Sequence, residues 1–178
     1  MPLFCRIAQD EDLPAMREIM RLAIDELQTG FLSRQEILAS HAVMGLDTQL
    51  VRDGTYFVVE AGGEIAGCGG WSRRATLYGG DHSLELREPR LLDPSSDAAR
   101  VRAMYTHPAF KRRGVGRCIL SESEKAASAE GFRRVELMAT LAGEPLYRAC
   151  GYREIERTSA DVGGIHVPLI LMGKDLPE

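Results

Sequence analysis

The sequence predicts one mixed α/β domain, in which a central, mainly antiparallel sheet carries helices on both faces. A strand pattern, a helical pattern and a second strand pattern follow one another over residues 101–138, which is the order of a right-handed crossover between parallel strands. Two further strand patterns flank Ala61-Gly62-Gly63 as an antiparallel hairpin. The 178 residues, 44% of them apolar, suffice for one domain with a real core, so we treat residues 1–178 as a single domain.

The N-terminal part is expected to contain one strand and two helices. Residues 3–8 form a short strand pattern, and the acidic residues 10–12 can cap a helix over residues 13–27. Apolar side chains recur on one face of that helix: Met16, Ile19, Met20, Ala23, Ile24 and Leu27. A second helix is expected over residues 33–46.

The middle of the chain is expected to hold the hairpin and a long connection. The hairpin strands cover residues 56–60 and 64–71. Residues 77–98 are irregular and contain several Gly, Pro and Asp residues. A connection of this length inside a compact domain is often functional.

The crossover and a final hairpin complete the predicted sheet. The strand over residues 101–106 ends at His107-Pro108, because proline cannot continue a ladder. Helical spacing of apolar residues runs from Val115 to Ala129, Gly131 is placed to end the helix, and a strand follows over residues 134–138. Strand patterns over residues 152–157 and 167–172 are joined by a Gly163-Gly164 turn.

The most informative stretch is residues 107–117, where four cations surround the first turn of the crossover helix. They are Lys111, Arg112, Arg113 and Arg117. The amino end of a helix already carries roughly half a positive charge, so each cation there costs a few tenths of a kcal/mol. A bound anion reverses the sign of that penalty, and Gly114 and Gly116 let the backbone approach such an anion closely. The segment therefore predicts an anion site.

Two common phosphate-binding patterns do not fit this segment. The P-loop needs Gly, four residues and then Gly-Lys-Ser/Thr, and no such string occurs. The dinucleotide fingerprint needs a third glycine three residues after Gly116, where Ile119 stands.

Residues 111–116 instead resemble the acyl-CoA loop of the GNAT superfamily of N-acyltransferases. The family pattern is Gln or Arg, two residues, Gly, one residue, and Gly or Ala, and Lys111 departs from it by keeping the charge without the planar fork of arginine. Residues 145–152 resemble a second family segment, in which an aromatic residue or Leu precedes Tyr, three residues, Gly and an aromatic residue. The resemblance covers nearly the whole chain, but only these two motifs are specific.

This resemblance implies a GNAT-like fold and an N-acetyltransferase that passes an acetyl group from acetyl-CoA to a primary amine by direct attack in a ternary complex. The backbone of residues 112–117 would hold the pyrophosphate, and main-chain groups of Met104 and Thr106 would line the pantetheine and the acyl carbonyl. The residues expected to bind the cofactor are Met104, Tyr105, Thr106, Lys111, Arg112, Arg113, Gly114, Val115, Gly116 and Arg117. By the same resemblance, a bulge in the strand over residues 101–106 would offer a backbone N–H to the oxyanion.

Tyr147 matches the tyrosine that many GNAT enzymes use as general acid, which makes it the catalytic candidate. A thiol with a pKa near 8.5 leaves as a weaker base than a phenolate near 10, so full proton transfer from an unperturbed tyrosine is uphill by about 2 kcal/mol. Tyr147 is therefore expected to act mainly as a hydrogen-bond donor, unless the loop cations lower its pKa. Its alternative role is that of a core aromatic residue on a short helix.

The acceptor amine must be neutral to attack, and for a lysine-like amine with a pKa of 10.4 this costs roughly 4.6 kcal/mol at neutral pH. A base or a desolvated amine site must offset that cost. His82 and Glu85 in the long connection are the candidates for this work, and Trp71 is a candidate for stacking on the acceptor. Each also has a plain alternative, as a solvated loop residue or as a residue at the edge of the core.

Composition limits the remaining functions. A net charge of −4 argues against a nucleic-acid binder. The four cysteines lack C-x-x-C spacing, so no metal site and no disulfide framework are expected. The start of the chain lacks the apolar core of a signal peptide and no apolar run approaches membrane length, which predicts a cytoplasmic protein with no membrane association.

The identity of the acceptor, a small-molecule or protein amine, cannot be read from the sequence. The alternatives to acetyl transfer are transfer of a different acyl group, a catalytically silent acyl-CoA-binding regulatory module and a purely structural domain. Dimers are common in the family that the chain resembles, and a homodimer is one of the states that the sequence leaves open.

Overall fold

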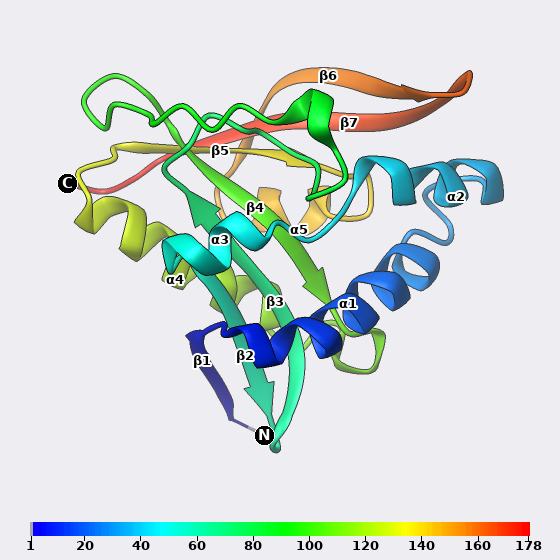
Figure 1. The fold of residues 1–178 in the computed structure, drawn as a ribbon, viewed down its shortest axis with the longest axis horizontal. Helices are drawn as coiled ribbons and strands as arrows, with labels where there is room; N and C mark the ends of the chain where they lie inside the picture. Colours follow the sequence, from blue (N-terminus) through cyan, green and yellow to red (C-terminus); the bar gives the residue numbers. More distant parts are fainter. Residues whose placement is uncertain (1) are drawn as a thin grey trace.

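A computed structural model describes residues 2–178, which form a seven-stranded mixed sheet in the order β1-β2-β3-β4-β5-β7-β6 (Figure 1). The strands are β1 (Leu3–Ile7), β2 (Tyr56–Ala61), β3 (Glu64–Ser72), β4 (Ala99–Thr106), β5 (Arg134–Ala139), β6 (Arg153–Val162) and β7 (Ile165–Asp175). Only β4 and β5 pair in parallel, and every other neighbouring pair is antiparallel. The predicted mixed, mostly antiparallel sheet with a parallel crossover is confirmed.

Helices cover both faces of this sheet, as predicted. They are α1 (Leu13–Leu22), the π-helical turn η2 (Ala23–Leu27), α2 (Arg34–Val43), α3 (Thr48–Asp53), α4 (Val115–Ala129) and α5 (Glu144–Ala149). α1 and α3 lie on one face and α4 and α5 on the other, while α2 packs against β7 (Figure 1). Side chains along β2 point alternately to the two faces of the sheet and pack against the helices on each. Val58 packs with residues of α1, and its neighbour Val59 packs with Ile119 of α4.

The N-terminal helices differ from the expectation in their bounds. The periodic pattern over residues 13–27 is one continuous segment, but its last turn widens into η2. The second helix is confined to α2, which begins after a reciprocal cap between Ser33 and Glu36. The short helix α3 was not predicted; Asp47 caps its start, and Gly54 ends it at φ +73°.

β4 pairs with β5 over only two positions, Ala99 with Val135 and Arg100 with Glu136. Further along β4, Gly70 of β3 stands opposite Arg102 and Cys68 stands opposite Tyr105, so β4 carries one extra residue. Ala103, at φ +51°, lies in this bulge. The bulge expected in this strand is confirmed, and the parallel pairing of β4 with β5 ends before it, at Arg100.

Buried tyrosines hold the bulge in place. Tyr56 donates a hydrogen bond of 2.9 Å to the carbonyl oxygen of Ala103. The hydroxyl of Tyr105 donates to the carbonyl of Gly45 and accepts from the N–H of the same residue, both at 3.0 Å. Burial raises the pKa of Tyr56 and of Tyr105, so both hydroxyls stay protonated and can donate.

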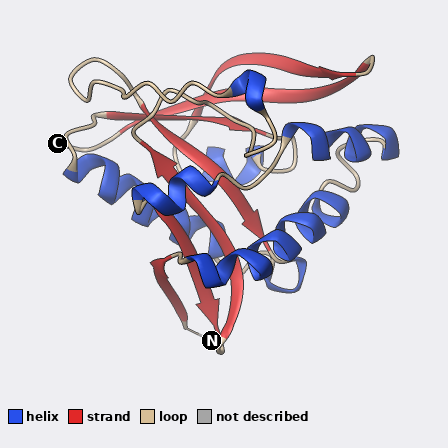
Figure 2. Ribbon diagram, viewed as in Figure 1, coloured by secondary structure: helices blue, strands red, loops and turns tan. Residues whose placement is uncertain are grey.

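The long connection between β3 and β4 is almost entirely loop, apart from the short turn η3 (Leu84–Leu86) (Figure 2). A buried ion pair fixes it to β4 and α3. Arg102 donates to Asp47 at 3.1 Å and to the carbonyl of Gly79 at 2.9 Å, and Arg87 donates to the same carboxylate at 3.1 Å. Residues 77–79 are thereby held beside β4.

Among residues 2–178, no helix combines the length and the apolar character that a membrane span requires. No group of three or more His, Cys, Asp or Glu side chains in the same range is arranged to hold a metal ion. The cysteines that the structure describes are all unpaired thiols.

Replacing Asp47 with Ala is expected to lower the free energy of unfolding by about 3–5 kcal/mol, because Arg102 would stay buried without its partner. Urea unfolding of the variant and the wild type measures this difference. Glu122→Ala is the matched control, since Glu122 pairs with an exposed Lys125 at 3.4 Å and its removal should cost less than about 1 kcal/mol. Equal losses in the two variants would contradict the structural role of the buried pair.

Candidate active site

Two cavities meet where β4 and β5 separate. The larger, of about 790 Å³, lies between residues 111–117, α5 and residues 23–31. The smaller, of about 80 Å³, lies between β4, β5 and residues 77–79. They share five lining residues, which are Met44, Met104, Tyr105, Thr140 and Tyr147. These side chains therefore form the boundary between the two cavities.

One end of the larger cavity is formed by the start of α4. The chain leaves β4 through the turn η4 (Pro108–Phe110), and Arg112 and Gly114 then take left-handed conformations at φ +60° and +87°. α4 begins directly afterwards, so the unpaired N–H groups of its first turn lie at the cavity wall. A Cβ atom at Gly116 would stand 2.5 Å from Cδ2 of Leu146, which shows how closely the backbone is packed there.

The cations of this segment lack protein counter-charges. Lys111, Arg112 and Arg117 line the larger cavity, whereas Arg113 lies over the ring of Phe110 at 5.6 Å and does not line it. All four cations are exposed, and none forms an ion pair within residues 2–178. An exposed helix start with unpaired cations and a glycine backbone fits a pyrophosphate group.

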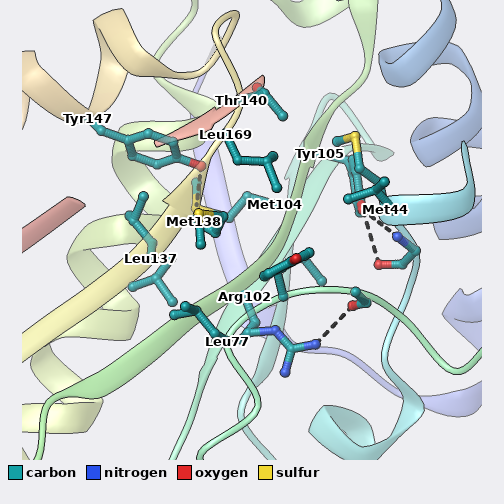
Figure 3. Close-up of a pocket in the computed structure, with 16 residues that line it drawn as sticks. Met44, Leu77, Arg102, Met104, Tyr105, Leu137, Met138, Thr140, Tyr147 and Leu169 are labelled. Carbon is teal, nitrogen blue, oxygen red and sulfur yellow. Dashed lines mark hydrogen bonds between the residues drawn. The ribbon is translucent and has the colours of Figure 1, made fainter. Parts of the chain in front are cut away.

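Tyr147 lies at the boundary between the cavities. It belongs to α5, and its hydroxyl points toward Sδ of Met104 at 3.7 Å (Figure 3). Its ring packs edge-on against Tyr152, with 5.9 Å between the centroids. Burial raises the pKa of Tyr147 to about 12, so the hydroxyl is protonated throughout the neutral range. The group can donate a hydrogen bond but is not available as a base.

The wall of the smaller cavity combines apolar side chains with polar side-chain and backbone groups. Figure 3 shows side chains of Met44, Leu77, Met104, Leu137, Met138 and Leu169 around it. Its polar side chains are those of Tyr78, Tyr105, Thr140, Tyr147 and Arg102, and the backbone of Gly45 and Gly79 also lines it. The guanidinium of Arg102 is turned toward the carbonyl of Gly79 (Figure 3).

A family model described as an acetyltransferase (GNAT) domain matches residues 52–154 of the chain. The chain belongs to the GNAT family of acetyltransferases. The matched segment runs from the end of α3 to the start of β6 and so includes the bulge, the cation-rich loop and Tyr147. No curated protein sequence matches the chain significantly.

Solved structures with the same GNAT fold cover almost the entire chain. A GCN5-related N-acetyltransferase from Rhodopseudomonas palustris has a TM-score of 0.73 at 18% identity, with 99% of this chain and 97% of that chain covered. The PaiA N-acetyltransferase from Thermoplasma acidophilum, in complex with coenzyme A, has a TM-score of 0.65 at 16% identity over 98% and 99% of the two chains. YncA from Salmonella typhimurium, a putative acetyltransferase with its cofactor acetyl-CoA, has a TM-score of 0.65 at 19% identity over 99% and 95%.

Most of the residues predicted to form the GNAT site lie together. The larger cavity is lined by Met104, Tyr105, Thr106, Lys111, Arg112, Gly114, Val115, Gly116, Arg117 and Tyr147. Arg113 is the one predicted cofactor residue that does not line it. The hydroxyl of Tyr105 is already engaged by Gly45, so this side chain supports the wall rather than offering a free polar group.

The three residues predicted to contact the acceptor line neither cavity. Trp71 is only 1% exposed and packs edge-on against Phe132 at 5.9 Å, because the C-terminal end of α4 and the strand after it cover this end of β3. It therefore belongs to the core and not to a cleft. His82 and Glu85 are exposed and line neither cavity. The long loop reaches the site through residues 77–79 instead.

Several wall residues were missed by sequence reasoning. Met44 follows α2 and Thr140 follows β5, and neither belongs to a recognisable motif. Gln28 lines the larger cavity directly after η2, and the side chain is 2% exposed. Its Nε2 donates to the carbonyl of Ile24 at 3.2 Å, while its Oε1 has no hydrogen-bond partner among the described residues. A single Gln at the end of a helix gives no signal for such a position.

The raised pKa of Tyr147 makes a prediction for alkaline unfolding. Below pH 10 the phenol of Tyr147 is protonated in the folded and in the unfolded chain, so its contribution to stability is fully present. Between pH 10 and about 12, only the unfolded chain loses this proton. Over that range this group should lower the free energy of unfolding by about 1.4 kcal/mol per pH unit. Urea unfolding at pH 9, 10, 11 and 12 should therefore show a shallower decline for Tyr147→Phe than for the wild type. Equal slopes would mean that Tyr147 has an ordinary pKa.

Proposed function

We propose that this GNAT domain transfers an acetyl group from acetyl-CoA to a primary amine, with both substrates bound at once. The observation that carries the proposal is the pair of cavities that meet at Met104 and Tyr147, one of which ends at the cation-rich start of α4. Two proteins of the same fold are described as complexes with coenzyme A or acetyl-CoA, which supports the choice of cosubstrate.

The larger cavity provides the cosubstrate site in this proposal. Backbone N–H groups of residues 112–117 would hold the pyrophosphate, and Lys111, Arg112 and Arg117 would supply charge. Met104 and Thr106 line the same cavity, and their main-chain groups would contact the pantetheine and the acyl carbonyl. The smaller cavity, beyond the boundary at Tyr147, would receive the acceptor amine.

Acetyl-CoA supplies an acyl group on a thioester. The amine nitrogen forms a bond to the carbonyl carbon, the carbon–sulfur bond breaks with its electron pair on sulfur, and the nitrogen loses a proton. A backbone N–H at the bulge around Ala103 and Met104 would stabilise the negative charge that develops on the carbonyl oxygen. Such a group needs no rearrangement during the reaction, because Tyr56 fixes the bulge.

Tyr147 acts in this scheme as a hydrogen-bond donor to the leaving sulfur. A pKa of about 12 lies roughly 3.5 units above that of an ordinary thiol, so complete proton transfer to the thiolate is uphill by about 4.8 kcal/mol. The proton that converts the thiolate to free coenzyme A therefore comes from the amine or from solvent.

We assign the reaction to the cytoplasm as part of the proposal, because unpaired cysteines are typical of reducing compartments.

Calorimetric titration tests the cosubstrate site. Wild-type protein is expected to bind acetyl-CoA and coenzyme A but not adenosine, because the pyrophosphate supplies most of the contact. The double variant Arg112→Ala, Arg117→Ala should bind coenzyme A roughly tenfold more weakly, equal to about 1.4 kcal/mol, and with less dependence on salt.

Arg133→Ala is the matched control for this titration, since Arg133 is an exposed arginine that lines neither cavity. Its affinity for coenzyme A should equal that of the wild type. Unchanged binding in the double variant, or binding of adenosine alone with the same affinity, would remove the pyrophosphate assignment.

Tyr147→Phe is expected to lower kcat by about 10²-fold and to leave the affinity for acetyl-CoA nearly unchanged, because the hydroxyl acts on the leaving sulfur. Release of free thiol measures kcat, and calorimetry measures the affinity. Tyr152→Phe is the control: its hydroxyl bonds to Glu124 at 3.2 Å, so its loss should affect stability and not turnover. An unchanged kcat in Tyr147→Phe would exclude Tyr147 from the reaction.

A further inference from the structure

The wall of the smaller cavity indicates which amines it can accept. Nine of its side chains are aliphatic or thioether groups: Val43, Met44, Leu77, Val101, Ala103, Met104, Leu137, Met138 and Leu169. The remaining polar side chains carry hydroxyls, and the single charged group is the guanidinium of Arg102. An amine that enters this cavity exchanges water for these side chains and for the backbone groups between them, and Figure 3 shows Thr140 and Tyr147 at one side of the space.

The charges around the cavity do not favour a second cation. Arg102 and Arg87 share the single carboxylate of Asp47, each at 3.1 Å, so this cluster keeps a net positive charge; the carboxylate also accepts from the N–H of Gln49. Asp47 is 3% exposed, so it is covered by these partners and is not offered to a ligand. The hydroxyls of Tyr78, Tyr105, Thr140 and Tyr147 are the other polar side-chain groups on this wall.

The charged groups of the adjoining larger cavity are mostly positive. Lys111, Arg112 and Arg117 line it, and Glu26 of η2 is an exposed carboxylate on its opposite side. Coenzyme A bound there would neutralise these cations, so they do not decide the charge of the acceptor. In the smaller cavity, an ammonium ion would lose hydration beside the guanidinium of Arg102, and among residues 2–178 no carboxylate or imidazole lines the wall to pair with it. This disfavours the charged form of the amine and lowers its pKa.

We propose that the acceptor is a small amine of low basicity, which is already neutral near pH 7, and that the basicity of the amine itself replaces a side-chain base. This inference rests on the proposed acetyl transfer. At pH 7 an alkylamine with a pKa of 10.4 is neutral in about one molecule in 2,500, whereas an α-amine with a pKa near 8 is neutral in about one in ten. A cavity that admits only the neutral form therefore favours the weaker base strongly.

Two isomeric amines provide a matched test on the wild-type protein. 4-Methylaniline and benzylamine have the same composition and nearly the same size, but at pH 7 the first is neutral and the second is an ammonium ion. With acetyl-CoA at saturation, release of free thiol gives kcat/KM for each amine between pH 6 and 9. We expect 4-methylaniline to be favoured at least tenfold at pH 7 with a flat profile, while the value for benzylamine rises about tenfold per pH unit.

The outcomes separate this inference from the proposed function. A higher kcat/KM for benzylamine at pH 7, or a benzylamine profile that levels off near pH 7, would show a side-chain base and overturn the inference while leaving acetyl transfer to amines intact. Acetylation of neither amine, nor of α-amines and alkylamines tested beside them, would reject amine acetylation itself. Calorimetric binding of coenzyme A would then still report on the cosubstrate site alone.

A pair of variants tests the electrostatic cause directly. Leu77 lies in a half-buried part of the loop on the wall of the smaller cavity, so Leu77→Glu and Leu77→Gln place a carboxylate or its neutral isostere there. The Glu variant should acetylate benzylamine several-fold faster than the Gln variant at pH 7. The same comparison with 4-methylaniline should give a ratio near one. Equal ratios for the two amines would contradict selection by charge.

Discussion

The separation of β4 from β5 is the constraint on which the rest of the site depends. The two strands share two positions of parallel pairing, and β4 then continues alone beside β3 through the bulge. Residues of β4 line both cavities, so the space for two ligands exists because this one strand pair is left incomplete. Close packing makes the arrangement rigid, since a Cβ atom at Gly69 would stand 2.5 Å from Cγ of Met104.

The parts of the fold that the sequence predicted are those with a long local signal. The crossover, the hairpin around Gly62 and the helix α4 each repeat their pattern over many residues, and each formed where expected. The helix α3 has six residues, which is too short for a periodic pattern, and it exists because Asp47 and Gly54 close its ends. The position of β7 between β5 and β6 is likewise a matter of tertiary pairing, and no residue pattern within the strand specifies it.

The candidate site also contains a part that the sequence predicted and a part that it did not. The cation-rich loop was predictable because its charges conflict with the helix that follows, and such a conflict is visible in the sequence alone. The acceptor side was not, because its wall is built from single residues on α2, β5 and the long loop. The prediction that Trp71 contacts the acceptor was wrong for a related reason, because only packing against Phe132 determines that this end of β3 is covered.

The shared boundary at Met104 and Tyr147 has a thermodynamic consequence. Both side chains belong to the walls of both cavities, and a contact of 3.7 Å joins them. A molecule that displaces either side chain on entering one cavity reshapes the other, so the affinities of the two cavities are linked. Linkage of this kind is reciprocal, which means that each ligand changes the dissociation constant of the other by the same factor. The order in which the ligands arrive can therefore alter rates, but it cannot alter the strength of this coupling.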